Sequence, residues 1–193
     1  MRFFLKTERL ILRAFTPDDV DNLFDLYNDP DVMHFINGGR PTPREEIESI
    51  LLPRILSYYR DGLCFGLWAA VEKSTGEFLG WFLFRVRDDT NSDQLALGYR
   101  LRKSAWGKGY ATEGSRALID KGFREQGVQR VTAETMVVNS RSRRVMEKCG
   151  LSLVRIFQQE WPDSDPIEGS ELGDVEYAMT RAEWLRQHSA EGN

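Results

Sequence analysis

The chain has 193 residues, of which 41% are hydrophobic, so it is long enough to bury a core of its own. These values exclude a disulfide-held miniprotein and a disordered tail. The 26 Lys and Arg residues are outnumbered by 30 Asp and Glu residues, which gives a formal charge of −4. General nucleic-acid binding is disfavoured, because neutralising phosphates requires an excess of cations.

The apolar runs do not support membrane insertion or secretion. The longest run, Cys64 to Val71, has eight residues, whereas a bilayer-spanning helix needs about twenty. The triplet Phe3-Phe4-Leu5 is also too short for the apolar part of a signal peptide. We therefore expect a cytoplasmic protein without a membrane partner.

Cysteine and histidine are scarce and scattered. Cys64 and Cys149 stand alone, and we expect both to act as small buried apolar residues. His34, in an early loop, and His188, in a polar tail, offer no metal cluster and no Ser-His-Asp triad. No metal is expected, and any chemistry must rest on carboxylates, hydroxyls and backbone amides.

Capping residues and apolar alternation predict the elements of the first half of the chain. In order, these are a strand at residues 8–14, a helix starting with Thr16-Pro17-Asp18-Asp19, a helix starting with the capping box Thr42-Pro43-Arg44-Glu45, and strands at residues 65–72 and 78–86. Pro53 is expected to kink or break the second helix. The two strands are expected to pair antiparallel through a hairpin loop at residues 73–77.

The second half continues as a mixture of strands and helices. It predicts a strand at residues 95–101, a helix ending near Glu125, a strand at 130–138, a helix capped by Asn139-Ser140 that runs to Cys149, strands at 153–161 and 174–179, and a capping-box turn at Thr180 to Glu183. Gly98 suggests a bulge in its strand. A frayed tail covers residues 185–193, and residues 1–193 are interpreted as one mixed α/β domain.

The sharpest local signal is the turn Trp106-Gly107-Lys108-Gly109-Tyr110-Ala111, which leads into a helix. Unbonded N–H groups at a helix N-terminus bind phosphate or pyrophosphate. The turn lacks the glycines of a Walker A loop and of a dinucleotide fingerprint, which excludes a P-loop protein. A tight turn without a ligand is the alternative.

Charge is unevenly distributed around this turn. Arg100, Arg102, Lys103 and Lys108 lie near it, and Arg141, Arg143, Arg144 and Lys148 crowd the next helix. If strands 95–101 and 130–138 are neighbours, both groups face one sheet edge, where a multiply phosphorylated ligand fits. Residues 160–176 instead hold seven acids and no Lys or Arg, so they form either a solvated loop or a rim that attracts an amine.

Three segments together resemble the GNAT superfamily of N-acetyltransferases, in the branch of the ribosomal-protein N-terminal acetyltransferases RimJ and RimL. They are Thr7 to Arg13, then Gly98-Tyr99-Arg100-Leu101 with Trp106 to Glu113, and finally Asn139 to Ser142 with Glu147 to Leu151. The resemblance covers residues 7–184. It implies the GNAT fold, a central mixed, mostly antiparallel twisted sheet of about seven strands flanked by helices. The sheet is expected to splay between its fourth and fifth strands, residues 95–101 and 130–138.

The resemblance also implies acetyl-CoA as co-substrate. Main-chain groups of Leu101 and Arg102 are expected to pair with pantetheine, amides from Gly107 to Thr112 to hold the pyrophosphate, and a bulge N–H at Gly98 to face the thioester carbonyl. Trp106 stands where the superfamily usually has Gln or Arg. The expected cofactor-binding residues are Leu101, Arg102, Trp106, Gly107, Lys108, Gly109, Tyr110, Ala111, Thr112, Asn139, Ser142 and Lys148.

The implied reaction is direct attack of a neutral amine on the acetyl thioester, without a cysteine nucleophile. Glu134 is the first candidate base, and Glu160 and Glu176 compete with it. Met146 stands where many relatives carry a tyrosine that protonates the leaving thiolate. Ser142 is the replacement for that tyrosine, or it only orients the cofactor, and Asn139 completes the expected catalytic set.

The acceptor is expected to be the α-amino group of a protein or peptide N-terminus, which is partly neutral near pH 7. A small amine such as an aminoglycoside, polyamine or amino acid is an alternative, and so is a non-catalytic acetyl-CoA-binding protein. The acceptor pocket is expected among residues 34–39, the first two helices and residues 161–173. Monomer and homodimer both remain open.

Overall fold

The computed structural model describes residues 3–59, 66–86, 93–158 and 167–189. They form one sheet in the order β1-β2-β3-β4-β5-β6-β8-β7, in which only the central β5–β6 pair is parallel. The strands are β1 (Phe3–Lys6), β2 (Leu10–Arg13), β3 (Gly66–Glu72), β4 (Phe78–Val86), β5 (Gln94–Leu101), β6 (Arg130–Met136), β7 (Ser152–Phe157) and β8 (Asp174–Thr180). The mixed sheet is as predicted, with β1 as an additional strand, because four residues are too few to show a strand pattern in the sequence.

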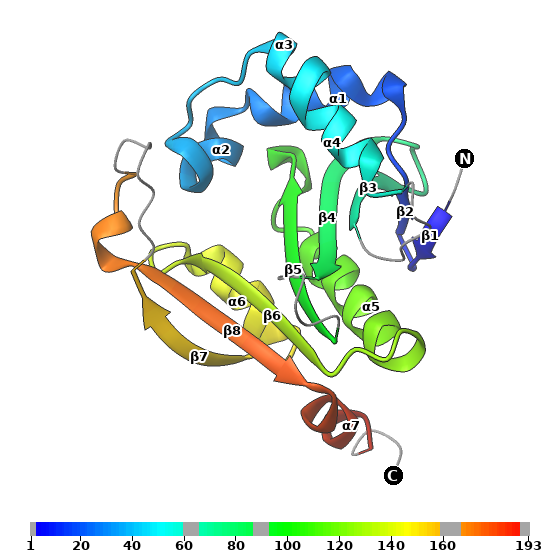
Figure 1. Cartoon of the computed structure of the whole chain (residues 1–193), viewed down its shortest axis with the longest axis vertical. Helices are drawn as coiled ribbons and strands as arrows, with labels where there is room; N and C mark the ends of the chain where they lie inside the picture. The colour runs from blue at the N-terminus through cyan, green and yellow to red at the C-terminus, as the bar shows by residue number, and fades with distance from the viewer. Residues whose placement is uncertain (1–2, 60–65, 87–92, 159–166, 190–193) are drawn as a thin grey trace.

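Helices cover both faces of this sheet (Figure 1). They are α1 (Val20–Tyr27), α2 (Pro30–Asn37), α3 (Arg44–Glu46), α4 (Leu52–Ser57), α5 (Tyr110–Glu125), α6 (Ser140–Lys148) and α7 (Arg181–Ser189). Residues of α1 and α4 pack on Leu67 and Ala69 of β3, and we call this side the α1 face. Residues of α5 and α6 pack on the opposite side, the α5 face. None of the described helices is long and apolar enough to cross a membrane.

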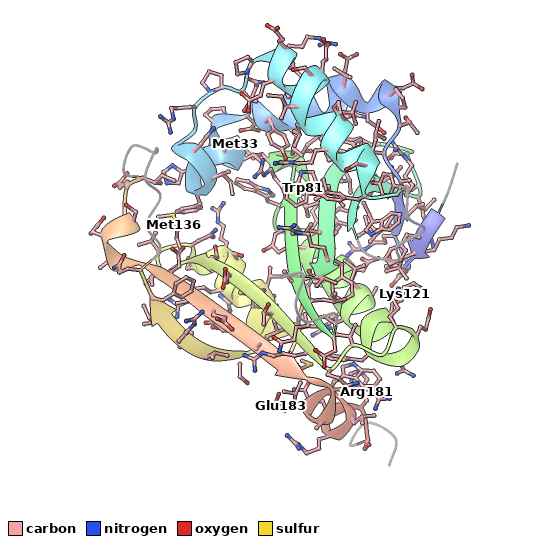
Figure 2. The ribbon with its side chains drawn as sticks, in the orientation of Figure 1. Met33, Trp81, Lys121, Met136, Arg181 and Glu183 are labelled. Carbon is pink, nitrogen blue, oxygen red and sulfur yellow. The ribbon has the colours of Figure 1, made fainter. Side chains whose placement is uncertain are left out.

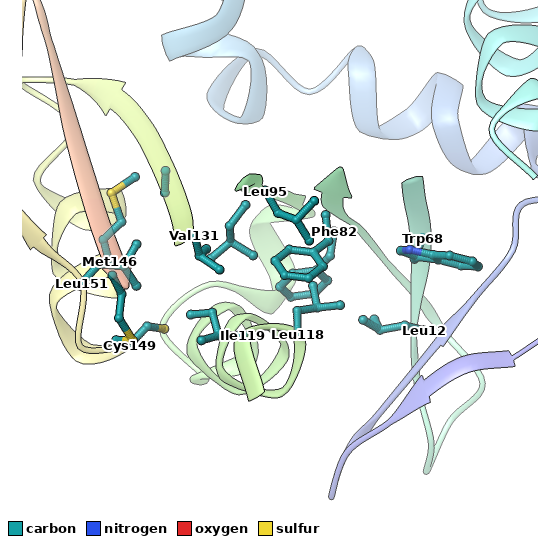
Figure 3. Packing of buried hydrophobic residues seen from close by; sticks show 14 of the residues in the cluster. Leu12, Trp68, Phe82, Leu95, Leu118, Ile119, Val131, Met146, Cys149 and Leu151 are labelled. Carbon is teal, nitrogen blue, oxygen red and sulfur yellow. The ribbon is translucent and has the colours of Figure 1, made fainter. Parts of the chain in front are cut away.

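The core of the α5 face is the larger of the two hydrophobic clusters. It joins Trp68 and Phe82 of the sheet to Leu118 and Ile119 of α5, and it continues to Met146 of α6 (Figure 3). Cys149 lies in this cluster, and burial raises the pKa of its thiol to about 11. Its apolar role is therefore as predicted, whereas Cys64 lies outside the described residues.

The N-terminal helices differ from the prediction in two places. His34 lies in α2 and not in a loop, because the Asp29 side chain accepts hydrogen bonds from two amides of the first turn and Pro30 occupies the first helical position. The capping box at Thr42 does not form, because Pro43 is the N-cap of α3. The backbone N–H and carbonyl of Thr42 bond instead to the Asn28 side chain. Pro53 is accommodated without a break, because the wider π-helical turn Ile47–Leu51 precedes it.

A buried ion pair fixes the start of α1. Both oxygens of Asp19 accept hydrogen bonds at 2.7 Å from the guanidinium of Arg13. Asp19 also accepts from the backbone N–H of Thr16, which forms a capping box at the helix start that was predicted from Thr16 to Asp19. Burial opposes ionisation of Asp19, but these hydrogen bonds outweigh it and lower the pKa of its carboxyl.

β5 and β6 lie together at their N-terminal ends and then part (Figure 1). β4 pairs with β5 as far as Leu101, whereas β6 pairs with β5 only from Gln94 to Ala96. The predicted splay between strands 95–101 and 130–138 is therefore confirmed. We call the unpaired stretch beyond Ala96 the parting of β5 and β6.

The bulge predicted at Gly98 is wrong. The β4–β5 register runs through Gly98 without a shift, and a Cβ there would make an ordinary 3.6 Å contact with Leu83. The close backbone approach occurs at Gly80, which has a φ of 132° and whose added Cβ would lie 2.1 Å from the carbonyl oxygen of Arg100. A glycine therefore does allow a close backbone approach in this sheet, but it is Gly80 of β4 and not Gly98 of β5.

The last strands and helix complete the sheet edge. β7 and β8 form the predicted antiparallel pair, although residues 159–161 lie outside the described residues. Thr180 and Glu183 form the predicted capping box. The tail expected from residue 185 is helical as far as Ser189, because Trp184 is buried against Phe123 and its Nε1 donates to Asp120 at 2.7 Å.

Candidate active site

Six consecutive backbone N–H groups, from Gly107 to Thr112, have no hydrogen-bond partner among the described residues. We call residues 107–112 the amide loop. The φ values of Gly107 and Gly109, 73° and 85°, bend it into the left-handed region that glycine adopts most easily. The loop leads into α5, whose N-terminus is the positive end of the helix dipole. The segment can therefore bind phosphate groups, the role that the family resemblance implies for it.

The amide loop is fixed by the turn between β1 and β2. Thr7 Oγ1 donates to Glu113 Oε1 at 2.5 Å, and Arg9 forms an ion pair with Glu113 at 2.6 Å. Arg9 Nη1 also donates to the carbonyl of Lys108 at 2.9 Å. Burial opposes ionisation of Glu113, but the hydrogen bonds from Thr7 and Arg9 lower the pKa of its carboxyl. Segments 7–13 and 107–113 of the family motif therefore act as one unit.

A surface hollow of about 580 Å³ lies beside this loop. It is lined by Thr7, Arg9, Gly109, Thr112, Glu113, Arg116, Ala117, Asp120 and Lys148. The hollow thus brings Lys148 of α6 to Gly109 and Thr112, three of the residues expected to bind the cofactor. Arg116 lies between them, since its Nε donates to the carbonyl of Lys148 at 3.1 Å. Loop amides and the three cations Arg9, Arg116 and Lys148 are therefore concentrated at this edge, together with the carboxylates Glu113 and Asp120.

Trp106 connects the amide loop to both neighbouring elements. Its Nε1 donates to the carbonyl of Leu101 at 2.9 Å, at the end of β5. Its ring lies 5.4 Å from the guanidinium carbon of Arg141 in α6. The neighbourhood of β5 and β6 thus brings the loop next to the basic start of α6, as the sequence predicted.

Three of the four cations expected around the turn lie elsewhere. Arg102 contacts Asp25 of α1 at 3.3 Å, and Lys103 pairs with Asp31 of α2. Arg100 lies on the α1 face over the rings of Tyr27 and Trp81. Strand alternation turns Arg100 to the α1 face, and the acids of α1 and α2 pair with Arg102 and Lys103. A count of charges along the sequence includes neither effect. Lys108 alone remains in the loop.

The backbone of β5 presents polar groups to the parting. Arg102 N–H donates to Leu79 O on the β4 side at 2.8 Å, so strand alternation directs the N–H and C=O of Tyr99 to the opposite side. Pairing with β6 has ended there. The expected main-chain groups of Arg102 have internal partners, because its carbonyl accepts from Ala105. Tyr99, which the sequence reasoning did not select, offers the free groups.

The hydroxyl of Tyr99 lies beside the start of α6. Tyr99 Oη donates to Ser142 Oγ at 3.4 Å, and burial raises the pKa of this phenol. Asn139 is the helix cap, since its side chain accepts from Ser142 N–H and donates to Thr135 Oγ1. Met146 is buried in the core. The structure thus brings together Asn139 and Ser142, two of the expected catalytic residues. Tyr99 places a phenol hydroxyl beside them, whereas Met146, at the position expected for a tyrosine, has none.

The candidate bases lie on β6 and β8, on the α1 face. Glu134 is exposed and pairs in register with Glu176, while Met136 pairs with Asp174. Glu176 is buried and holds Arg155 at 2.8 Å and Arg130 at 3.4 Å, so its oxygens are already engaged. Burial raises the pKa of Asp174, a carboxyl that the sequence reasoning counted only within the acidic stretch. Glu160 lies outside the described residues.

Comparisons with known proteins agree with this geometry. Residues 9–152 match the family described as the acetyltransferase (GNAT) domain. The chain is 34% identical over 188 residues to the "FsC-acetyl coenzyme A-N(2)-transacetylase" of Aspergillus fumigatus, covering 94% of this chain and 78% of that protein.

Solved structures show the same fold. A GNAT-family acetyltransferase from Bacillus anthracis superposes with a TM-score of 0.77 at 24% identity, covering 93% of this chain and 99% of that one. The RimL ribosomal L7/L12 alpha-N-protein acetyltransferase, solved with coenzyme A, gives 0.75 at 20% identity, covering 93% and 98%. The family match spans more than half of the sequence, and it agrees with a parted sheet and with the unpartnered N–H groups of the amide loop. The chain therefore belongs to the GNAT family of acetyltransferases and is an acyltransferase.

Proposed function

We propose that this chain transfers the acetyl group of acetyl-CoA to an α-amino group, and that residues 1–193 form a single catalytic domain. The observation that carries the proposal is the pair of unpartnered backbone surfaces, the amide loop and the parting edge of β5 at Tyr99. The unpaired N–H groups of the loop can bind the phosphates of this co-substrate, and the unpaired backbone of β5 can pair with its amide groups. When bound, acetyl-CoA supplies a thioester carbon at which the C–N bond forms as the C–S bond breaks, releasing CoA as a thiol.

Backbone and side-chain groups divide the binding role. The amide loop, with Lys148 at the hollow, holds the pyrophosphate end. Leu101 and Tyr99 pair with the pantetheine arm along the parting, and the N–H of Tyr99 faces the carbonyl oxygen on which negative charge develops. Trp106 keeps the loop at the end of β5. Asn139 positions Ser142 through the N-terminal cap of α6.

Two proton transfers complete the reaction. Glu134 takes the proton that the attacking amine loses. Asp174, on the same face of the neighbouring strand β8, competes with it for this role. On the α5 face, the Tyr99–Ser142 pair returns a proton to the leaving sulfur. A tyrosine whose pKa is raised by burial stays protonated and able to donate. Since a free thiol has a pKa of about 8.5, this second transfer is the less demanding one.

Two sources of an α-amino group fit this site. A protein or peptide N-terminus is the acceptor implied by the resemblance to RimJ and RimL. An amino-acid-like small molecule is the second, and the relative whose name specifies transfer to an N(2) nitrogen supports it, because the α-amine of an amino acid carries that same number. The α-amine of a protein or peptide N-terminus has a pKa of about 7.7–8.0, so it needs less help from a base than a lysine side chain. The α-amine of a free amino acid is more basic, because the neighbouring carboxylate stabilises its ammonium form, so this acceptor depends more on the base.

The test is acetyl-CoA consumption with mass-spectrometric identification of products. The acceptors are peptides with different N-terminal residues, free amino acids, polyamines and aminoglycosides. We expect acetylation of α-amines and little turnover of polyamines. Acetyl-CoA binding without turnover of any member would contradict the proposal and favour a non-catalytic binding protein.

A further inference from the structure

Arg100 is a cation of the α1 face without an anion. Its Nε and Nη1 atoms are buried and have no hydrogen-bond partner among the described residues, and the same holds for Nε1 of Trp81. The other arginine and lysine side chains nearby are paired, Arg102 with Asp25 and Lys103 with Asp31. A buried charged donor without a partner loses its hydration and gains nothing in return.

Aromatic rings hold this guanidinium in place. Its central carbon lies 4.3 Å from the ring centroid of Tyr27 in α1 and 5.1 Å from that of Trp81 in β4. Ring contacts stabilise the faces of a guanidinium but leave its N–H edges unused. Nη2 is neither buried nor hydrogen-bonded among the described residues, so the group reaches the surface through this atom. Burial lowers the pKa of Arg100, as expected for a charge without a counterion.

The position of Arg100 relates it to the reaction. It follows Tyr99 in β5, and its side chain points to the α1 face, whereas the Tyr99 backbone faces the parting. Glu134 and Asp174 lie on the same face beyond the parting, on β6 and β8. Met33 of α2, Trp81 of β4 and Met136 of β6 lie around this side of the parted strands (Figure 2). One cation and two carboxyls therefore flank the place where an acceptor amine must arrive.

We propose that Arg100, supported by Trp81, binds a carboxylate of the acceptor, so that the acceptor is an α-amino acid or an amino-acid-like molecule with a free carboxylate. The inference rests on the proposed function and narrows its acceptor class. A carboxylate accepts a charge-assisted hydrogen bond from a guanidinium, here from Nη2, the nitrogen that reaches the surface, and this supplies the missing anion. The neighbouring amine, which is cationic before it loses its proton, is then directed toward Glu134 and Asp174.

The test compares matched acceptors that differ only in the carboxylate. Free L-amino acids and their carboxamides are titrated by calorimetry into the full chain saturated with CoA. The same pairs are assayed for acetylation. We expect binding of the free acids to exceed that of the amides by about tenfold or more, from the loss of one charge-assisted hydrogen bond.

Variants separate the roles of charge and packing. Arg100→Met is expected to remove the preference for the free acid, and Arg100→Lys to restore part of it. Arg44→Met is the matched control, because Arg44 also lies over an aromatic ring of α1, Phe24, but already has Asp21 and Glu48 as partners. Thermal unfolding of each variant shows that the fold is retained.

The binding assay tests the carboxylate site, and the turnover assay tests the proposed reaction. Equal binding of acids and amides, binding of neither, or an unchanged preference in Arg100→Met would overturn the carboxylate site, whatever the turnover. Preferred acetylation of peptides with neutral N-terminal residues would overturn it as well and assign the acceptor to proteins. Carboxylate-dependent binding without acetylation would support the site and contradict only the proposed reaction.

Discussion

The two sides of the parted strands are built differently. On the cofactor side, the amide loop consists of backbone groups held by Thr7, Arg9 and Glu113. On the acceptor side, the polar groups are the side chains of Arg100, Glu134 and Asp174, which come from three strands. The cofactor side is braced by ion pairs and helix caps, whereas Arg100 has no ion-pair partner among the described residues.

A site built from backbone groups and a site built from side chains differ in how they tolerate sequence changes. Backbone amides bind phosphates whatever the side chains are, provided that glycines allow the turn. Side chains on separate strands can change independently without disturbing the loop. The buried guanidinium of Arg100, which has no anion among the described residues, costs stability, as is common at functional sites. Four predictions test this contrast, from the largest expected effect to the smallest.

Glu134→Gln is expected to reduce kcat by about 10²- to 10⁴-fold, the usual contribution of a general base. Acetyl-CoA affinity is expected to stay unchanged, because Glu134 lies on the α1 face, away from the hollow beside the amide loop. Steady-state kinetics and direct titration of acetyl-CoA measure the two effects. Glu168→Gln, at an exposed member of the acidic stretch 160–176, is the control. Unchanged turnover in Glu134→Gln would move the role of base to Asp174.

Paired and unpaired arginines are expected to respond in opposite ways. Asp19→Asn leaves the buried guanidinium of Arg13 without its carboxylate, and we expect a loss of about 3–5 kcal/mol in the free energy of unfolding. Arg100→Met removes a charge that has no partner, so we expect no loss. Urea unfolding of both variants gives the comparison. A similar loss in both would show that Arg100 stabilises the fold and not a ligand.

Gly109→Ala is expected to weaken acetyl-CoA binding by about tenfold, equivalent to about 1.4 kcal/mol. The φ of 85° at this position costs any L side chain about 1–2 kcal/mol, and relaxing it displaces the amides. Gly127→Ala is the matched control, since Gly127 has a φ of 70° beyond the other end of α5. Both variants are expected to lose similar stability, but only the first to lose affinity.

Acid is expected to weaken two carboxylate contacts, that of Asp19 at the start of α1 and that of Glu113 beside the amide loop. The pKa values of Asp19 and Glu113 lie below their ordinary values of 3.8 and 4.5. Each carboxylate therefore contributes stability that is present above its ordinary pKa and is lost as the pH falls through its folded value. A group that is titrating contributes at most about 1.4 kcal/mol per pH unit. Urea unfolding between pH 6 and 3 should show a smaller pH dependence in Glu113→Gln. An unchanged dependence would contradict a stabilising role for the contacts of Glu113 with Thr7 and Arg9.

Local signals in the sequence predicted most of the elements that frame the site. Asn139 caps α6 as predicted, because a cap depends on residues within one turn. The glycines of the amide loop were recognised for the same reason. The bulge at Gly98 and the loop at His34 were wrong, since the first depends on the neighbouring strand and the second on a cap formed by Asp29.

Of the proposed site, the sequence found the amide loop and missed much of the side on which we propose that the acceptor binds. Tyr99 sits inside the recognised segment 98–101, but only the end of β5–β6 pairing frees its backbone. Glu176 was a plausible base until the structure placed two arginines on it. Asp174 and Arg100 carry no local signal, because their roles depend on burial and on strands that are distant in sequence.

The sequence by itself determined the family, the order of most elements and the amide loop, all of which follow from short-range caps, glycines and motif spacing. The tertiary structure alone decided which cations have partners. Arg100, Arg102 and Lys103 are near neighbours in the chain, yet strand alternation and the acids of α1 and α2 leave only Arg100 without an anion among the described residues. Pairing is a property of three-dimensional neighbours, so a charge count along the chain cannot reveal it.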